Sequence, residues 1–267
     1  MQGKTVLVTG STDGIGKQTA LELAKMGARV LLHGRNAERV QATAAEIRSA
    51  SRAEVDFVVG DYSSLAQVRQ MAADVLVKVG QLDVLINNAG AYMLERQITE
   101  DGFEMSWQVN HLAPYLLTIL LLERMKSNTP SRIVNVASIM HNQARLDYDN
   151  LQGEKEFKPS RVYCLSKLGN VITTLDLAER LAGSGVTVNC LHPGVVDTKM
   201  LRVSFSIQGT TLENGAQTSL FLATSPSVEG VTGKYFDDCK ETAPSPVSLD
   251  AAERRHFMQV TNQMLGL

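Results

Sequence analysis

The sequence predicts an α/β fold: one doubly wound domain in which about seven parallel strands carry helices on both faces. Three observations predict it. Short runs of Val, Ile and Leu alternate with stretches of helical periodicity, which is typical of a parallel sheet. The first run passes through a glycine-rich turn into a helix. The 267 residues, 44% of them hydrophobic, suffice for one large core, so we assign residues 1–267 to a single domain.

The glycine-rich turn follows the first strand and contains Gly10, Gly14 and Gly16. Glycine lets the backbone turn tightly and approach a ligand closely, and the N–H groups at the start of a helix attract a pyrophosphate. The hydroxyls of Ser11 and Thr12 are expected to add donors there. A P-loop is excluded because five residues separate Gly10 from Gly16 and a glutamine replaces the Ser or Thr that would hold Mg²⁺. A strand–turn–helix without a ligand is the alternative.

The other elements of the first half follow in the order strand, helix, strand, helix, strand. We expect strands over 28–33, 55–59 and 82–86, and helices over 36–50 and 64–78. Asn36 is placed to cap the first of these helices.

The second half repeats the alternation. One long helix is expected over 99–126 with a kink at Pro114, then a strand over 132–136, a helix over 160–182 and a strand over 186–191. Residues 195–212 show no clear period and indicate a mobile substrate loop. A helix over 213–223, a strand over 234–236 and a polar tail over 240–267 with a final helix from 250 to 265 complete the chain.

Composition narrows the function. The net charge of −2 without a basic run excludes a nucleic-acid partner, and no apolar stretch reaches the ~20 residues that span a bilayer. We therefore expect a cytoplasmic chain with no membrane anchor and a small-molecule partner. The three cysteines lack C-x-x-C spacing, so no metal is expected. The sequence leaves a homo-oligomer open.

Tyr163 and Lys167 are four residues apart, so on a helix they share one face. A nearby cation favours the phenolate, and an unperturbed tyrosine has a pKa near ~10. The pair is therefore expected to have a lowered tyrosine pKa and to exchange protons near neutral pH. Taken alone it carries little weight, because this spacing is common on exposed helices.

The chain resembles the short-chain dehydrogenase/reductase family, with a Rossmann-type fold, over roughly residues 4 to 200. The resemblance rests on Thr9-Gly10-x-x-x-Gly14-Ile15-Gly16, Asn87-Asn88-Ala89-Gly90, Asn110, Ser138, Tyr163-x-x-x-Lys167 and Pro193-Gly194. It implies that Tyr163 is the general acid/base, that Ser138 binds the substrate oxygen, and that Lys167 holds the ribose and lowers the pKa of Tyr163. By the same resemblance Asn110 completes a proton relay.

The resemblance also implies the residues that bind the cofactor. They are Gly10, Ser11, Thr12, Gly14, Ile15 and Gly16 in the turn, Arg35, Asn36, Asp61, Tyr62, Asn88, Ala89 and Gly90 after the next strands, Tyr163 and Lys167, and Pro193, Gly194, Val196 and Thr198 in the loop. The alternative for Asp61 is to cap the helix that begins near Ser64.

The cofactor is expected to be NADP(H). An NAD-specific site would carry Asp or Glu at the end of the second strand to bind the ribose 2′-hydroxyl, but the chain has His33-Gly34-Arg35 there. Gly34 is expected to leave room, and Arg35 to bind a phosphate through its planar guanidinium. The alternative is a solvent-exposed arginine that opens a helix.

A closer likeness is to the branch that contains retinol dehydrogenases and related reductases of lipophilic carbonyls. It rests on Asn110-His-Leu-Ala-Pro, Pro130-Ser-Arg-Ile-Val-Asn-Val-Ala-Ser138, Lys167-Leu-Gly-Asn170 and Leu191-His-Pro-Gly-Val-Val196. Ala137 and Gly169 depart from that branch, where Ser and Ala are usual. His111 and His192 belong to the background pattern and receive no role.

We therefore expect an enzyme that transfers hydride between NADP(H) and a hydrophobic aldehyde or ketone, or the corresponding alcohol. Apolar side chains after the strand ends are expected to form the pocket, namely Met93, Leu94, Met140, Met200 and Leu201. The alternatives are a non-catalytic NADP(H)-sensing or scaffold protein on the same fold, and an enzyme acting on sterols or nucleotide-linked sugars.

Overall fold

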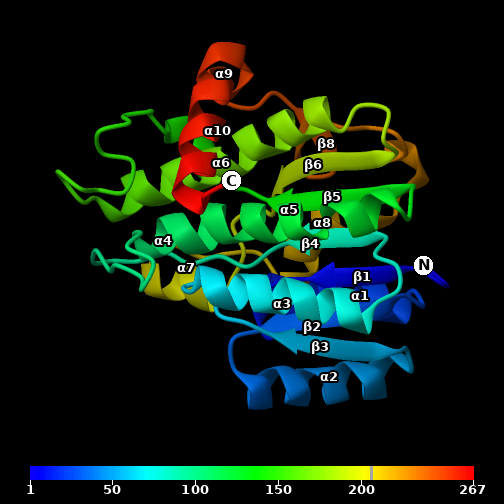
Figure 1. The fold of residues 1–267 in the computed structure, drawn as a ribbon. Coiled ribbons are helices and arrows are strands. Elements are labelled where there is room, and N and C mark those ends of the chain that lie inside the picture. The colour runs from blue at the N-terminus through cyan, green and yellow to red at the C-terminus, as the bar shows by residue number, and fades with distance from the viewer. Residues whose placement is uncertain (205–206) are drawn as a thin grey trace.

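The computed structural model describes residues 1–204 and 207–267 and confirms the doubly wound α/β fold. Within these residues, eight strands form one sheet in the order β3-β2-β1-β4-β5-β6-β7-β8, and the strand order reverses between β1 and β4 (Figure 1). Seven strands are parallel, and β8 runs antiparallel to β7. The strands are β1 (Thr5–Val8), β2 (Arg29–Gly34), β3 (Val55–Val59), β4 (Val84–Asn87), β5 (Ser131–Val136), β6 (Val186–His192), β7 (Lys234–Asp237) and β8 (Lys240–Thr242).

Helices cover both faces of the sheet because the central strands are apolar on both sides. One face carries α1 (Gly14–Lys25), α2 (Ala37–Ser51) and α8 (Leu212–Thr224). The other carries α3 (Leu65–Lys78), α5 (Ala113–Lys126) and α6 (Pro159–Arg180), against which α10 (Ala251–Leu265) packs (Figure 1). Among the described residues, no helix has both the length and the apolar character needed to cross a membrane.

The sheet has one strand more than the sequence predicts. Strand β8 follows β7 through a tight turn in which Asp238 and Cys239 have φ values of 49° and 59°. Its three residues are exposed and polar, so no apolar pattern marks it. The antiparallel pair closes the edge of the sheet next to β7.

The predicted long helix over 99–126 is wrong at its start. A bridge between Ile98 and Glu104 closes a turn, and the Glu104 carboxylate accepts a hydrogen bond from the Trp107 N–H at 2.8 Å. The helical stretch therefore begins with α4 (Met105–Trp107) and widens into the π-helical turn η1 (Gln108–Leu112) before α5. Pro114 has no N–H for a regular i→i−4 bond, which accounts for a wide turn just before it rather than a kink.

The predicted loop over 195–212 contains structure. A bridge between Val196 and Thr210 closes it, and the short helix α7 (Lys199–Ser204) lies inside it. Residues 205–206 of the predicted substrate loop lie outside the described residues. The remaining short elements are η2 (Ile139–Gln143), η3 (Pro226–Val228) and α9 (Pro246–Leu249).

Candidate active site

The glycine-rich turn docks against the end of β4. Gly10 has a φ of 62°, and a Cβ there would lie 2.8 Å from the Cα of Ala89. The side-chain amide of Asn88 donates to the carbonyls of Thr9 and Gly10 at 2.8 and 3.2 Å. The ends of β1 and β4 are thus joined at the point where the strand order reverses, which is where ligands bind in doubly wound folds.

The turn leaves a cradle that fits a pyrophosphate. Gly14 has a φ of 55°, and a Cβ at Gly16 would overlap the carbonyl of Gly10 and the amide of Asn88. Asp13 caps α1 by accepting from the Gly14 N–H at 2.8 Å, while the N–H groups of Ile15 and Gly16 have no intrahelical acceptor. The N-terminus of α1, with glycines in the turn before it and in its first turn, has the geometry that binds the phosphates of a dinucleotide.

The expectation that the Ser11 hydroxyl faces the phosphate is wrong. Ser11 is fully buried, and its Oγ accepts from the His33 N–H at 2.9 Å. Its own N–H donates to the His33 carbonyl at 3.0 Å. Ser11 therefore fixes the turn to β2, and only Thr12 keeps a partly exposed hydroxyl there. The room expected beside Gly34 is taken by the Thr12 methyl group, which would lie 2.6 Å from a Cβ at Gly34.

His33 is a site residue that the sequence reasoning missed. Its Nδ1 accepts from the Gly10 N–H at 3.1 Å, so the proton lies on Nε2, which is 2.9 Å from the Gly60 carbonyl. Burial lowers the pKa of His33 to about 4, so the ring is neutral. The neutral ring ties the glycine turn to the end of β3. The only sequence signal is a polar residue that ends an apolar strand.

The end of β2 presents two arginines. Arg35 is exposed and makes no hydrogen bond or ion pair with any other described residue. Arg39, which the sequence reasoning missed, pairs with Asp13 at 2.8 Å across the glycine turn. The Asn36 side chain accepts from the Arg39 N–H at 2.8 Å, so the predicted cap is confirmed and its carbonyl oxygen is already occupied. Of the two arginines after β2, Arg35 is thus the one with no hydrogen bond or ion pair to the described residues.

Asp61 and Tyr62 follow β3. Asp61 accepts from the Ser63 N–H at 2.9 Å, and Ser64 rather than Asp61 caps α3. Asp61 is half-buried and keeps its second carboxylate oxygen free of a hydrogen bond to the described residues. The Tyr62 ring is buried and stacks on His33 at 4.9 Å, so its side chain supports the site from below instead of facing a ligand.

Ser138 and Tyr163 meet at the ends of β5 and the start of α6. The Ser138 side chain lies close enough to the Tyr163 hydroxyl to lower its pKa, and the Tyr92 ring lies 5.2 Å from the Tyr163 ring. The expected lowering of the tyrosine pKa is wrong for this state. Burial raises the pKa of Tyr163 to about 12, and the nearby Ser138 side chain only partly offsets it. A protonated phenol beside a serine hydroxyl forms a pair of donors.

Lys167 is buried one turn after Tyr163, with its Nζ 5.8 Å from the tyrosine ring centre. The ammonium donates to the Val136 carbonyl at 2.8 Å and forms no ion pair within the described residues. Burial lowers the pKa of Lys167 to about 8, so it is charged at neutral pH. Its Nζ would be 3.5 Å from a Cβ at Gly90, so its unused N–H groups lie beside the open Gly90 backbone. A buried cation without a counter-ion fits a site for ribose hydroxyls.

Asn110 lies in the π-helical turn beside these groups. Its amide holds both backbone groups of Ala91, at 2.7 and 2.8 Å, and donates to the Ser166 hydroxyl at 3.0 Å. The wide turn aims this side chain at the loop after β4. Within the described residues it has no hydrogen bond to Tyr163 or Lys167, so its side chain positions the loop, and the proton relay stays a prediction.

The loop after β6 returns to the glycine turn. Pro193 and Gly194, whose φ is 85°, turn the chain out of the strand, and Val196 is buried beneath it. The Thr198 methyl group would lie 3.6 Å from a Cβ at Gly14. The predicted loop residues are therefore placed over the predicted phosphate cradle. Ile15 lies below them, with its Cγ1 3.1 Å from a Cβ at Gly215.

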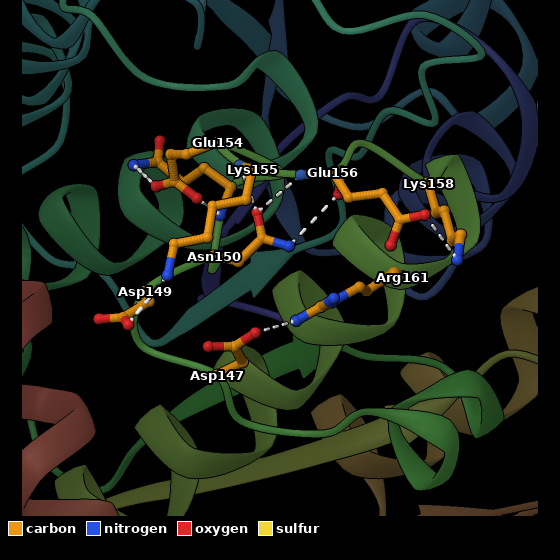
Figure 2. A network of polar contacts seen from close by, with 9 residues as sticks. Asp147, Asp149, Asn150, Glu154, Lys155, Glu156, Lys158 and Arg161 are labelled. Atoms are coloured by element: carbon orange, nitrogen blue, oxygen red, sulfur yellow. Dashed lines mark hydrogen bonds and ion pairs between the residues drawn. The ribbon is translucent and has the colours of Figure 1, made fainter.

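The segment before α6 is fixed by its own polar contacts (Figure 2). The side-chain oxygen Oδ1 of Asn150 accepts from the Lys155 N–H at 2.9 Å, and Arg161 pairs with Asp147 at 2.6 Å. Arg161 precedes Tyr163 by two residues, so this ion pair fixes the first turn of the helix that carries the tyrosine.

Gly169 stands where alanine is usual in the retinol dehydrogenase branch, and side-chain packing accounts for this difference. A Cβ at Gly169 would lie 2.6 Å from Nδ1 of His111, whose ring is buried between Trp107 and Phe257. His111 also contacts Thr261 of α10 at 2.9 Å. The histidine ring therefore occupies the space that an alanine methyl would need, and it has a packing role.

The fold and the site together define a nicotinamide-dependent oxidoreductase: a phosphate cradle at the switch point faces a Ser–Tyr–Lys constellation. A family model described as short chain dehydrogenase matches residues 4–208, and the chain belongs to this family.

The similar proteins include retinol dehydrogenases. Human retinol dehydrogenase 14 is 41% identical over 295 residues, which cover 100% of this chain and 88% of that protein. Human retinol dehydrogenase 11 is 42% identical over 277 residues, which cover 100% and 87%. These matches confirm the likeness to the retinol dehydrogenase branch.

Solved structures agree on the fold. An uncharacterized protein from Mycobacterium paratuberculosis matches with a TM-score of 0.82 and 28% identity, over 98% of this chain and 93% of that one. A gluconate 5-dehydrogenase from Beutenbergia cavernae, described as NAD(P) dependent and holding NADP at low occupancy, matches with a TM-score of 0.73 and 27% identity, over 89% and 96%.

Proposed function

We propose that this short chain dehydrogenase is an NADP(H)-dependent reductase of hydrophobic aldehydes or ketones, or the dehydrogenase of the corresponding alcohols. The observation that carries the proposal is the buried Lys167, which has no counter-ion among the described residues and lies one turn from a protonated Tyr163 beside Ser138. A scaffold protein has no need to bury a charged lysine beside a phenol, because such burial is costly without a binding partner. The catalytic alternative is therefore favoured over a purely sensing role.

The bound nicotinamide would supply or accept the hydride. The cradle at Gly10, Gly14 and Gly16 would hold its pyrophosphate, and Lys167 its ribose. When a carbonyl is reduced, negative charge grows on the substrate oxygen, and the Ser138 and Tyr163 hydroxyls are placed together to donate to it. The proton comes from the Tyr163 Oη, which its raised pKa keeps protonated.

The choice of NADP(H) is supported by the end of β2. Neither of the two residues directly after the strand, Arg35 and Asn36, is a carboxylate, and Arg35 is exposed without a partner among the described residues. Arg39 lies four residues further but is paired with Asp13. A 2′-phosphate would give Arg35 a planar, charge-assisted contact at no cost to an existing ion pair.

Arg35→Ala is expected to lower kcat/KM with NADPH by roughly 10- to 100-fold, since a hydrogen bond to a charged group is worth about 1.5–3 kcal/mol. The value with NADH should change little. Steady-state kinetics with both cofactors check this, with Arg255→Ala, an exposed arginine on α10, as the control for loss of one charge. Equal use of both cofactors by the wild type, or an unchanged preference in Arg35→Ala, would contradict the proposal.

The hydrophobic substrate is supported by the rim of the site. Large apolar side chains stay 41–62% exposed in the loops after β4, β5 and β6 and on α9. They are Leu94, Ile98, Ile139, Val195, Val203, Ile207 and Leu249. The Met200 side chain reaches the site, with its Cε 3.9 Å from a Cβ at Gly90. Exposed apolar side chains on the loops that follow the carboxyl ends of the strands favour an apolar ligand.

Apolar carbonyl compounds are expected to be reduced with a higher kcat/KM than size-matched compounds that carry a carboxylate or phosphate. A competition between the two sets with NADPH measures the preference. A preference for the anionic set would overturn the apolar assignment. It would direct attention to Arg145, which lines a cavity of about 430 Å³ beside Cys164, because Arg161 is already paired with Asp147 at 2.6 Å and Arg202 with Asp197 at 3.5 Å.

A further inference from the structure

His141 connects the catalytic serine to the C-terminal part of the chain. It lies in η2, three residues after Ser138, and is fully buried. Its Nδ1 is 2.6 Å from the Ser138 carbonyl oxygen, and its backbone N–H donates to the same oxygen at 3.1 Å. On its far side, Nε2 accepts from the N–H of Ser245 at 3.0 Å.

These contacts define the tautomer of the ring. A backbone N–H can only donate, so Nε2 of His141 carries the lone pair and Nδ1 carries the proton. The Nδ1–H therefore donates to the Ser138 carbonyl. Burial lowers the pKa of His141, which keeps the ring neutral and both contacts intact. The ring also packs against Tyr235 of β7, with 4.7 Å between ring centres.

The Ser138 carbonyl thus receives two hydrogen bonds from one residue. These bonds fix the peptide plane that follows the serine, while the serine hydroxyl accepts from the Met140 N–H at 3.2 Å and lies beside Tyr163. The direction of the serine hydroxyl therefore depends on the backbone that His141 holds. Shifts of about 1 Å in such a group can change a rate by ~10²-fold.

Ser245 begins a segment that is fastened to α6. The short helix α9 follows it directly, and Arg254 of α10 donates to the Leu249 carbonyl at 2.9 Å. The same guanidinium pairs with Glu179 near the end of α6. The ring of His141 thereby links the position of residues 245–249 to the backbone of Ser138, which is 107 residues earlier than Ser245 in the chain.

We propose that His141 is a positioning residue that couples the position of residues 245–249 to the orientation of Ser138. This inference rests on the proposed function for the reaction that Ser138 serves. The contact between Ser245 and His141 holds the ring, and the ring holds the serine backbone. A change made in the C-terminal segment is therefore felt at the catalytic serine without touching the cofactor cradle.

The main test compares Ser245→Pro with Ser245→Ala. Ser245 has a φ of −49°, which proline adopts, and its hydroxyl makes no hydrogen bond within the described residues. Proline replaces the N–H with a ring carbon that would overlap Nε2 of His141, so the contact is lost and residue 245 or the ring must move, whereas alanine keeps the contact. We expect Ser245→Pro to lower kcat by roughly tenfold or more and to leave the Kd of NADPH within about twofold, with Ser245→Ala like the wild type.

Two variants of the ring separate its contacts. In His141→Asn the side-chain amide can replace the Nδ1–H donor to Ser138, whereas His141→Leu removes both contacts. We expect His141→Asn to recover part of the kcat that His141→Leu loses. If His141→Leu does not fold, the Ser245 pair still decides the question, because it leaves His141 itself unsubstituted.

Hydrogen exchange of the amides of 138–143 gives a readout that needs no substrate. Faster exchange in Ser245→Pro than in Ser245→Ala supports the coupling, and equal exchange overturns it. Equal kcat in the two variants of an active protein also overturns it. A wild type that turns over no carbonyl compound or alcohol contradicts the proposed function instead, and the exchange experiment then decides the coupling alone.

Discussion

Tyr163→Phe is expected to lose turnover by ~10²–10⁴-fold, the range typical of general acid–base catalysis, while it binds NADPH nearly as the wild type does. The change deletes one hydroxyl and keeps the ring that packs against Tyr92. The loss should therefore appear in kcat, because the proton donor acts in the transition state. Steady-state rates of carbonyl reduction and a fluorescence titration with NADPH measure the two quantities.

The pH dependence follows from two pKa values. Burial raises the pKa of Tyr163 to about 12, so the proton donor is present throughout the neutral range and is lost only as the pH approaches that value. Lys167 has its pKa lowered to about 8, so the free protein loses this charge first as the pH rises. The KM of NADPH is therefore expected to rise above about pH 8 before kcat for reduction falls.

A remote tyrosine provides the control. Tyr148→Phe removes a hydroxyl that contacts Glu253 at 3.3 Å, outside the site, and should keep kcat near the wild-type value. Near wild-type turnover in Tyr163→Phe would contradict the assigned mechanism. A parallel loss of NADPH affinity would indicate that the hydroxyl acts in cofactor binding.

The elements that the sequence predicts well are those whose signals are local. The apolar run before Gly10, the glycine turn and the start of α1 lie within a few neighbouring residues, and the structure has them where the pattern predicts. The predicted helix start near residue 99 was wrong because helical periodicity alone does not reveal the cap at Glu104 or the wide turn before Pro114. Strand β8 carries no apolar signal at all.

The two histidines that support the site could not be found in this way. The ring of His33 reaches Gly60, 27 residues away, and that of His141 reaches Ser245, 104 residues away. A sequence shows that a histidine is present but not which distant backbone group it meets. The predicted direction of the Tyr163 pKa shift was wrong for a related reason. The sequence reveals the nearby lysine, but it does not reveal how deeply the tyrosine is buried, and burial has the larger effect on the pKa.

Gly10→Ala is expected to destabilise the fold and to abolish measurable cofactor binding. Gly10 has a φ of 62°, which costs a non-glycine residue about 1–2 kcal/mol. The new Cβ would also lie 2.8 Å from the backbone Cα of Ala89, and forcing extra atoms into a packed site costs about 1–3 kcal/mol more. The turn must then move away from β4, which opens the cradle.

Gly3→Ala separates the two costs. Gly3 has a φ of 72°, but a Cβ there meets nothing within 4 Å, so this variant carries the strain without the clash. Urea denaturation should show a loss of about 1–2 kcal/mol in Gly3→Ala and about twice that loss in Gly10→Ala, with unchanged m-values in both. NADPH binding should survive only in Gly3→Ala. Equal stability of the two variants would mean that Ala89 yields to the methyl group, and retained NADPH affinity in Gly10→Ala would show that the cradle does not depend on the contact between the turn and β4.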